Sequence, residues 1–145
     1  MPEEILSAAA RRRLIELARR AIETELSAVV EKAVQSEGDV DSPREELQRR
    51  AGAFVTLVRR SNGELRGCVG VTEARYPLHQ VVARMAVAAA LHDGRFTPVG
   101  AHELADLSVH VSVLGPLTPI EPDEVEVGVH GVVVRCAGKT GLLLP

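Results

Sequence analysis

The chain has 145 residues, of which 46% are hydrophobic and 26% charged, so it has the composition of a folded protein and the length of one domain. Its formal net charge of −3 gives no overall attraction for phosphate backbones, which disfavours nucleic acid as a partner. Two phenylalanines, one tyrosine and no tryptophan leave the core to aliphatic side chains and offer no aromatic platform for stacking bases.

The N-terminal third of the chain predicts two helices. Apolar residues recur at helical spacing over residues 7–34, with charged residues between them, which predicts an amphipathic helix with a solvated charged face. A second, short helix is predicted to run to about Arg50. It begins with Ser42, Pro43 and Glu45, which form a capping box with proline at the first helical position.

A β-hairpin is predicted around Asn62-Gly63, because this dipeptide is preferred in two-residue type I′ turns. The flanking residues 53–60 and 65–71 are rich in β-branched and apolar side chains, as strands are. Successive side chains of a strand point to opposite faces, so Arg66 and Cys68 are expected on one face, roughly 6 to 7 Å apart. This arrangement places a cation near a thiol.

Cys68 stands between two glycines, and its role has two interpretations. Gly67 and Gly70 weaken a strand interior, so they predict a bulge or a close backbone approach that gives access to the thiol. Cysteine is also among the most often buried residues, so a lone cysteine on a strand is by default a small core side chain. A reactive thiol needs thiolate character and exposure, which no sequence displays.

The second half of the chain predicts a helix and three strands. Residues 77–92 have an apolar stripe at helical spacing, and residues 107–114 alternate so that His110 faces away from the valines. Residues 131–135 and 140–144 predict a final hairpin. The order helix, hairpin, helix, strand, hairpin predicts an α+β fold with a mainly antiparallel sheet covered by helices, in one domain over residues 1–145.

The cysteines and histidines exclude several classes of site. Two distant cysteines, no secretory signal and no long apolar run predict a cytoplasmic protein without a membrane segment. Cys136 lies in an apolar segment and is expected to be buried. The histidines show no zinc or metalloprotease spacing, so neither a metal nor a cofactor is predicted; they are His79, His92, His102, His110 and His130.

Five blocks of the chain together resemble the AMMECR domain family, whose bacterial and archaeal members are called AmmeMemoRadiSam system protein A. The blocks are residues 54–57, 65–70, 93–98, 111–114 and 129–131. The resemblance extends over about residues 14–145, and the segment around Arg66, Gly67 and Cys68 is its most specific part.

The resemblance implies a fold and partners more directly than a reaction. It implies a duplicated strand-helix-strand motif and action together with a Memo-like protein and a radical SAM protein. Family members generally continue into a further C-terminal segment, whereas this sequence ends at Pro145, so the family's C-terminal extension is expected to be absent.

The resemblance also implies a cysteine-centred site. Cys68 is then a nucleophile, a thiolate ligand or a covalent carrier, and His130, in the family-like pair with Gly131, is the preferred proton carrier ahead of His110. The substrate is expected to contact Arg66, Gly67, Gly70, Asp93 and Arg95, with the two arginines binding anionic groups.

Two alternatives stay open. Asp93 either binds the substrate or forms a structural ion pair at the end of a helix. In the structural alternative Phe96 packs into the core. The whole protein is alternatively a non-catalytic binding module. In that case the glycine-flanked strand and the aliphatic C-terminal end bind another protein, and Cys68 serves only packing.

Overall fold

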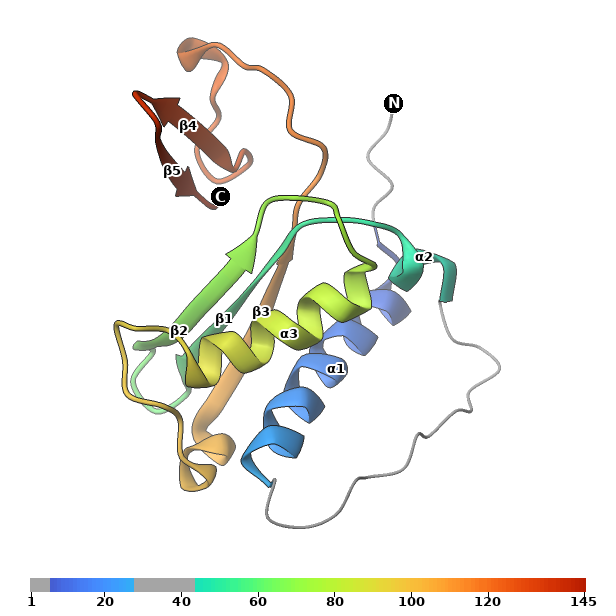
Figure 1. Ribbon diagram of the computed structural model, residues 1–145, viewed down its shortest axis with the longest axis vertical. Helices are drawn as coiled ribbons and strands as arrows, with labels where there is room; N and C mark the ends of the chain where they lie inside the picture. Colours follow the sequence, from blue (N-terminus) through green and yellow to red (C-terminus); the bar gives the residue numbers. More distant parts are fainter. Residues whose placement is uncertain (1–5, 28–43) are drawn as a thin grey trace. The chain divides into compact units, whose positions relative to one another are not determined.

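The computed structural model describes residues 6–27 and 44–145 (Figure 1). By their contacts these residues form two compact units, one ending at Gly115 and the other spanning Pro116–Pro145. The first unit contains α1 (Ala8–Leu26), α2 (Arg44–Gln48), β1 (Ala53–Arg59), β2 (Leu65–Val71), α3 (Leu78–Leu91) and β3 (Leu107–Val113). The second contains β4 (Val132–Cys136) and β5 (Lys139–Leu143). Both sheets are antiparallel, which confirms the predicted α+β class.

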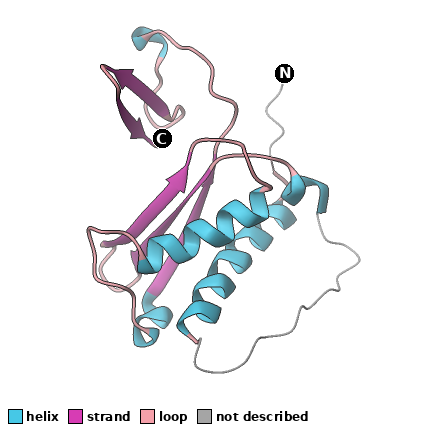
Figure 2. Cartoon of the chain, viewed as in Figure 1, coloured by secondary structure: helices cyan, strands magenta, loops and turns pink. Residues whose placement is uncertain are grey.

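In the first unit, α1 and α3 lie side by side over one face of a three-stranded sheet in the order β2-β1-β3 (Figures 1 and 2). The alternation along β1 shows which face they cover, because Ala53, Val55 and Leu57 are buried while Phe54 and Thr56 are only half-buried. We call the face that carries Phe54 and Thr56 the outer face. Of the predicted strand-helix-strand duplication, the described residues contain the run β2-α3-β3.

The core lies between the two helices and the inner face of this sheet. It is aliphatic, as the composition predicts, and most of its members come from α1, β1 and α3. The largest fully buried side chains are Leu14, Ile22, Val55, Leu57, Leu78, Val82 and Leu107.

The helices begin where their capping residues predict, as far as the described residues extend. The hydroxyl of Ser7 accepts a hydrogen bond from the Ala10 backbone N–H at 3.1 Å and starts α1, whose predicted continuation to residue 34 passes beyond the described residues. The predicted capping box at Ser42 also lies outside them. Pro77 stands at the N-terminal cap of α3 and confirms the predicted start of that helix.

The hairpin between β1 and β2 is not the predicted type I′ turn. A type I′ turn needs positive φ at both central residues, and only Gly63 has it, at 75°. Arg59 pairs instead with Glu64 through a hydrogen bond of 2.8 Å, which leaves a four-residue loop. The cause is Asp106, whose carboxylate accepts hydrogen bonds from the backbone N–H and the hydroxyl of Ser61 at 2.9 and 2.7 Å.

A β-bulge follows the loop and sets the direction of every later side chain of β2. Leu57 pairs with Gly67 while Val58 pairs with Leu65, so Arg66 has no partner on β1. The bulge interrupts the alternation on which the predicted common face of Arg66 and Cys68 depended, and that prediction is wrong. Both predicted backbone features, a bulge and a close approach, occur at this position.

The second unit contains a two-stranded sheet in which Val132 pairs with Leu143 and Cys136 with Lys139. Its turn has positive φ at both Ala137 (48°) and Gly138 (77°). Cys136 is exposed, so its predicted burial is wrong. A sheet of two short strands has no second layer within its own unit to bury a side chain at the end of a strand.

In the described part of the chain, no helix combines the length and the apolar character needed to cross a membrane.

Candidate functional site

Cys68 lies on the outer face of the sheet, in a row of polar side chains that crosses all three strands. Its partner on β1 is Thr56, whose own partner on β3 is His110. The Cys68 Sγ and Thr56 Oγ1 atoms are 3.2 Å apart, within hydrogen-bonding distance. Cys68 and Thr56 are half-buried and His110 is exposed. The row therefore places a thiol, a hydroxyl and an imidazole on a surface that the helices do not cover.

His110 is on this row but not in direct contact with the thiol. Two strand spacings separate it from Cys68, roughly 10 Å between Cα atoms, and its Nε2 is 3.2 Å from the Ser108 hydroxyl. Proton transfer between the imidazole and the thiol therefore needs an intervening group. Thr56, between the two, supplies a hydroxyl.

Asp93 and Arg95 bond to the backbone of Cys68 at the open edge of β2. The Cys68 N–H donates to Asp93 Oδ2 at 2.9 Å, and Nη2 of Arg95 donates to the Cys68 carbonyl oxygen at 3.2 Å. A carboxylate and a guanidinium thus satisfy the two backbone groups that a further strand would bind. Because these groups point away from β1, the pairing with Thr56 is of the non-hydrogen-bonded kind, in which side chains lie closest.

The two charged groups also hold each other. Nε of Arg95 donates to Asp93 Oδ1 at 3.0 Å and Nη2 donates to Oδ2 at 2.7 Å, a bidentate pair. The side-chain hydrogen bond from Arg95 is the main cause that lowers the pKa of Asp93 well below its ordinary value, and the N–H of Cys68 adds to it. The same bond raises the pKa of Arg95, to which attraction by Cys68 contributes less.

Arg66 occupies a different place from the one predicted beside Cys68. Its guanidinium is buried and donates to the Glu103 carboxylate from Nε and Nη2 at 2.9 and 3.0 Å. It also donates to the backbone oxygens of Thr97 and Pro98 at 2.8 and 3.4 Å. These bonds connect β2 to the segment before β3, so the site proposed below does not include Arg66.

The two predicted glycine contacts have packing explanations. A Cβ at Gly67 would overlap the backbone oxygen of Ala89, so the glycine lets α3 approach β2 closely. A Cβ at Gly70 would overlap the ring of Phe54, its partner on β1. Gly67 is on the buried face and is left out of the site, whereas Gly70 and Phe54 extend the outer face next to Cys68.

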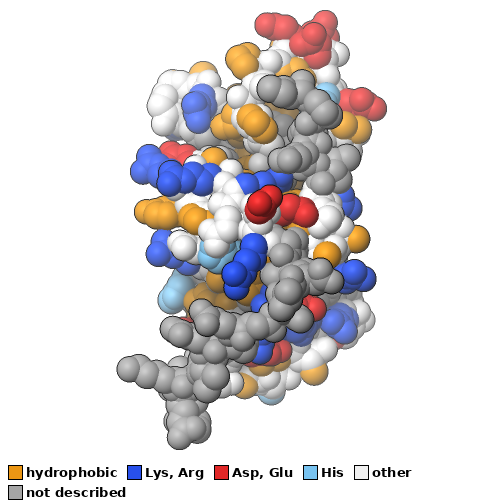
Figure 3. Space-filling view, turned by 90° about the vertical axis from the view of Figure 1, so that its right-hand side faces the viewer, with side chains coloured by type: hydrophobic (Ala, Val, Ile, Leu, Met, Phe, Trp, Pro, Cys, Tyr) orange, Lys and Arg blue, Asp and Glu red, His pale blue; other side chains and the backbone are white. Residues whose placement is uncertain are grey.

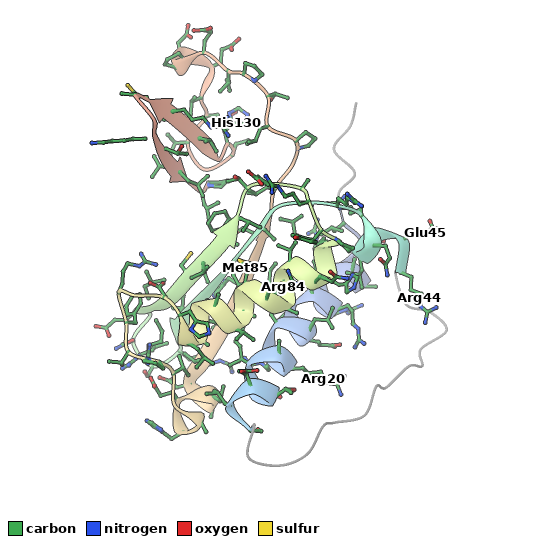
Figure 4. All side chains as sticks on the ribbon, in the orientation of Figure 1. Arg20, Arg44, Glu45, Arg84, Met85 and His130 are labelled. Atoms are coloured by element: carbon green, nitrogen blue, oxygen red, sulfur yellow. The ribbon has the colours of Figure 1, made fainter. Side chains whose placement is uncertain are left out.

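His130 belongs to the second unit, as Figure 4 shows. Its Nδ1 accepts a hydrogen bond from the backbone N–H of Glu126 at 3.0 Å. The predicted pairing of His130 with Cys68 remains a prediction. Among the described residues, no group of three or more histidine, cysteine, aspartate or glutamate side chains is arranged to hold a metal ion.

Figure 3 shows basic, acidic and hydrophobic side chains interspersed on the face that it presents.

A family model described as AMMECR1 matches residues 15–145. The chain belongs to the AMMECR1 family. The resemblance seen in the five sequence blocks is therefore confirmed.

The names of three similar proteins give no activity. A protein of Aeropyrum pernix is 41% identical over 91% of this chain, and one of Thermotoga maritima is 43% identical over 75%. The crystal structure of the uncharacterized protein PH0010 from Pyrococcus horikoshii, 38% identical, matches 92% of this chain and 68% of its own with a TM-score of 0.79.

The chain spans only part of these relatives' length. It covers 54% of protein MK0488 of Methanopyrus kandleri and 58% of the Aeropyrum pernix protein.

One residue of the candidate site went unnoticed in the sequence, namely Thr56. Its signal was present in the pairing of the two predicted strands, but the predicted turn gives the wrong register. With a two-residue loop at Asn62-Gly63, Leu57 and not Thr56 stands opposite Cys68. The four-residue loop moves the register by two residues, which would place Val55 opposite Cys68, and the bulge at Arg66 moves it back by one, so Thr56 is the partner.

Proposed function

We propose that this AMMECR1 protein performs thiol chemistry at Cys68, as an enzyme or as a covalent carrier. The observation that supports the proposal most is the position of the thiol, which stands half-buried on the outer face beside the hydroxyl of Thr56. A cysteine kept only for packing would fit better among the aliphatic side chains of the inner face.

In the proposed step the Cys68 sulfur attacks an electrophilic carbon of the substrate. The thiol proton passes to a base by way of the adjacent Thr56 hydroxyl. The sulfur forms a bond to the carbon, and the leaving group departs with the bonding electron pair. Arg95, bound to the Cys68 carbonyl oxygen, places a positive charge next to the thiol-bearing residue. His110, on the same face of the sheet, is the imidazole that carries the proton to or from solvent, and the role expected for His130 stays a prediction from the sequence.

Alkylation of Cys68 by iodoacetamide tests the proposal in a Cys136→Ser variant that has one thiol. Because the thiol lies on the outer face of the sheet, which the helices do not cover, we expect Cys68 to be alkylated at neutral pH in the folded protein, before any unfolding in urea. Thr56→Val should change the rate in the folded state only, and Ser112→Ala, on the same face of β3, serves as the matched control. Labelling that occurs only after unfolding would refute the proposal.

The second candidate function is a binding module in which Cys68 serves packing. The observation that favours it is the half-buried aromatic ring of Phe54 on the same outer face. Such a module would keep its binding partner when Cys68 is replaced by serine, whereas a thiol-dependent protein would lose its activity.

We also propose, from family membership, that the protein acts with a Memo-like protein and a radical SAM protein. Co-purification with the two candidates produced in the same cells tests this. Recovery of neither, under conditions in which each is folded, would contradict it.

A further inference from the structure

The guanidinium of Arg95 is bound on one side and open on the other. Nε and Nη2 make the bonds to Asp93 and to the Cys68 carbonyl oxygen. Among the described residues, Nη1 has no hydrogen-bond partner, and the Arg95 side chain is 59% exposed. The Cζ atom of Arg95 lies 5.4 Å from the centre of the Phe96 ring. Within the described part of the chain, the two N–H donors of Nη1 have no hydrogen-bond acceptor.

The buried carboxylate of Asp93 holds the Arg95 guanidinium in place through two hydrogen bonds. Its side chain is 6% exposed and accepts the bonds from both Arg95 and the Cys68 N–H, so one buried carboxylate ties the cation to the thiol-bearing residue. The Asp93 carboxylate is therefore buried, whereas the Arg95 side chain is mostly exposed to solvent. A ligand that approaches the outer edge of β2 meets the positive group first.

We infer that the Cys68 site takes a substrate that carries an oxyanion, a carboxylate or phosphate group, which binds to Nη1 of Arg95, with Asp93 as the positioning residue. The inference rests on the proposed function of Cys68 and names its substrate class. Guanidinium donors match carboxylate and phosphate oxygens in geometry and charge. A substrate held there would have its reactive carbon presented to the neighbouring sulfur.

The test compares two alkylating reagents that differ in charge, iodoacetate and iodoacetamide, on the full chain carrying Cys136→Ser. In both reactions the Cys68 sulfur forms a bond to the methylene carbon and iodide leaves with the bonding electrons. We expect Arg95→Met to lower the ratio of the iodoacetate rate to the iodoacetamide rate by about threefold or more at low ionic strength. Arg95→Lys keeps the charge and should retain most of the ratio.

Arg84→Met is the matched control. Arg84 is exposed on α3, where its guanidinium lies 5.2 Å from the centre of the Tyr76 ring, so its loss should leave the ratio unchanged (Figure 4). Added potassium chloride should lower the ratio in the Cys136→Ser protein without any change at Arg95, because salt screens the attraction. This second measurement holds even if Arg95→Met does not fold.

The outcomes separate this inference from the proposed function. If Cys68 reacts rapidly with both reagents but the ratio changes neither in Arg95→Met nor with salt, the oxyanion inference is wrong and the thiol chemistry stands. If Cys68 reacts with neither reagent until the protein unfolds, the proposed function is wrong and the inference falls with it.

Discussion

Two arginine-carboxylate ion pairs involve β2 or its edge, and they differ in how far the arginine is exposed to solvent. Arg66 and Glu103 are both enclosed, with side chains 6% and 18% exposed. Arg95 and Asp93 are unequal, because the carboxylate is buried and the guanidinium is mostly exposed. Two pairs of a guanidinium and a carboxylate therefore have different roles. One pair joins two segments of the fold, and the other leaves a cation at the surface beside Cys68.

The largest effect should come from breaking the enclosed pair. Glu103→Gln leaves the Arg66 guanidinium buried without its counter-charge, and we expect a loss of about 3 to 5 kcal/mol in the free energy of unfolding. Urea denaturation measures it. Arg59→Gln is the control, because Arg59 binds the same carboxylate at 3.2 Å from a more exposed position, and its loss should stay within about 1 kcal/mol. Equal losses of unfolding free energy in Glu103→Gln and Arg59→Gln would mean that the burial of Arg66 does not make its ion pair more important than that of Arg59.

The pH dependence of stability should follow from the enclosed pair as well. The Arg66 side chain lowers the pKa of Glu103 from 4.5 to about 2 in the folded protein. A carboxylate with a lowered folded pKa stabilises the fold above its unfolded pKa and loses that contribution as pH falls. Unfolding free energy should therefore decrease between about pH 4.5 and pH 2. The decrease should be smaller in Glu103→Gln; an identical pH profile would contradict the assignment.

Removing the buried carboxylate of the open pair should have an intermediate effect. Asp93→Asn weakens the bonds to Arg95 and to the Cys68 N–H, and we expect a loss of about 1 to 3 kcal/mol in urea denaturation. Asp123→Asn, at an exposed position of the second unit, should change nothing measurable. A loss in Asp93→Asn as large as in Glu103→Gln would remove the distinction between the two pairs.

The smallest effect on stability should come from the exposed cation. Arg95→Met removes a mostly exposed partner, so the free energy of unfolding should change by about 1 kcal/mol or less. Thermal unfolding followed by circular dichroism measures this. The main effect of Arg95→Met should instead be a lower ratio of the iodoacetate rate to the iodoacetamide rate at Cys68. A large loss of stability would make Arg95 a structural residue like Arg66.

The fold was predictable where the signal is local. The strand at β3, the helix start at Pro77 and the final hairpin follow from periodicity and from proline and glycine punctuation, and the structure confirms them. Turn geometry was less predictable. Asn62-Gly63 has the stronger type I′ signal, yet positive φ at both turn positions occurs at Ala137 and Gly138. Asp106 holds the first loop, and a contact so distant along the chain leaves no trace in the dipeptide.

The arrangement of the candidate site was less predictable than the fold. Cys68, Asp93 and Arg95 lie together, and their role as site residues stays a prediction. Arg66 and Gly67 were predicted to contact the substrate, but Arg66 is buried against Glu103 and Gly67 packs against the backbone of α3. Thr56 was missed because its pairing with Cys68 depends on a register that shifts by one residue.

The sequence by itself determined the α+β class, the segments that form helices and strands, and the family, because periodicity, capping and short motifs depend on neighbours along the chain. Only the tertiary structure decided that Cys68 faces outward and that Arg95, rather than Arg66, keeps an open side. Both outcomes depend on residues 93–106, which lie far along the chain and fix the loop, the buried ion pair and the edge of β2. A shift of one residue in a strand exchanges its two faces, and only long-range contacts select between them.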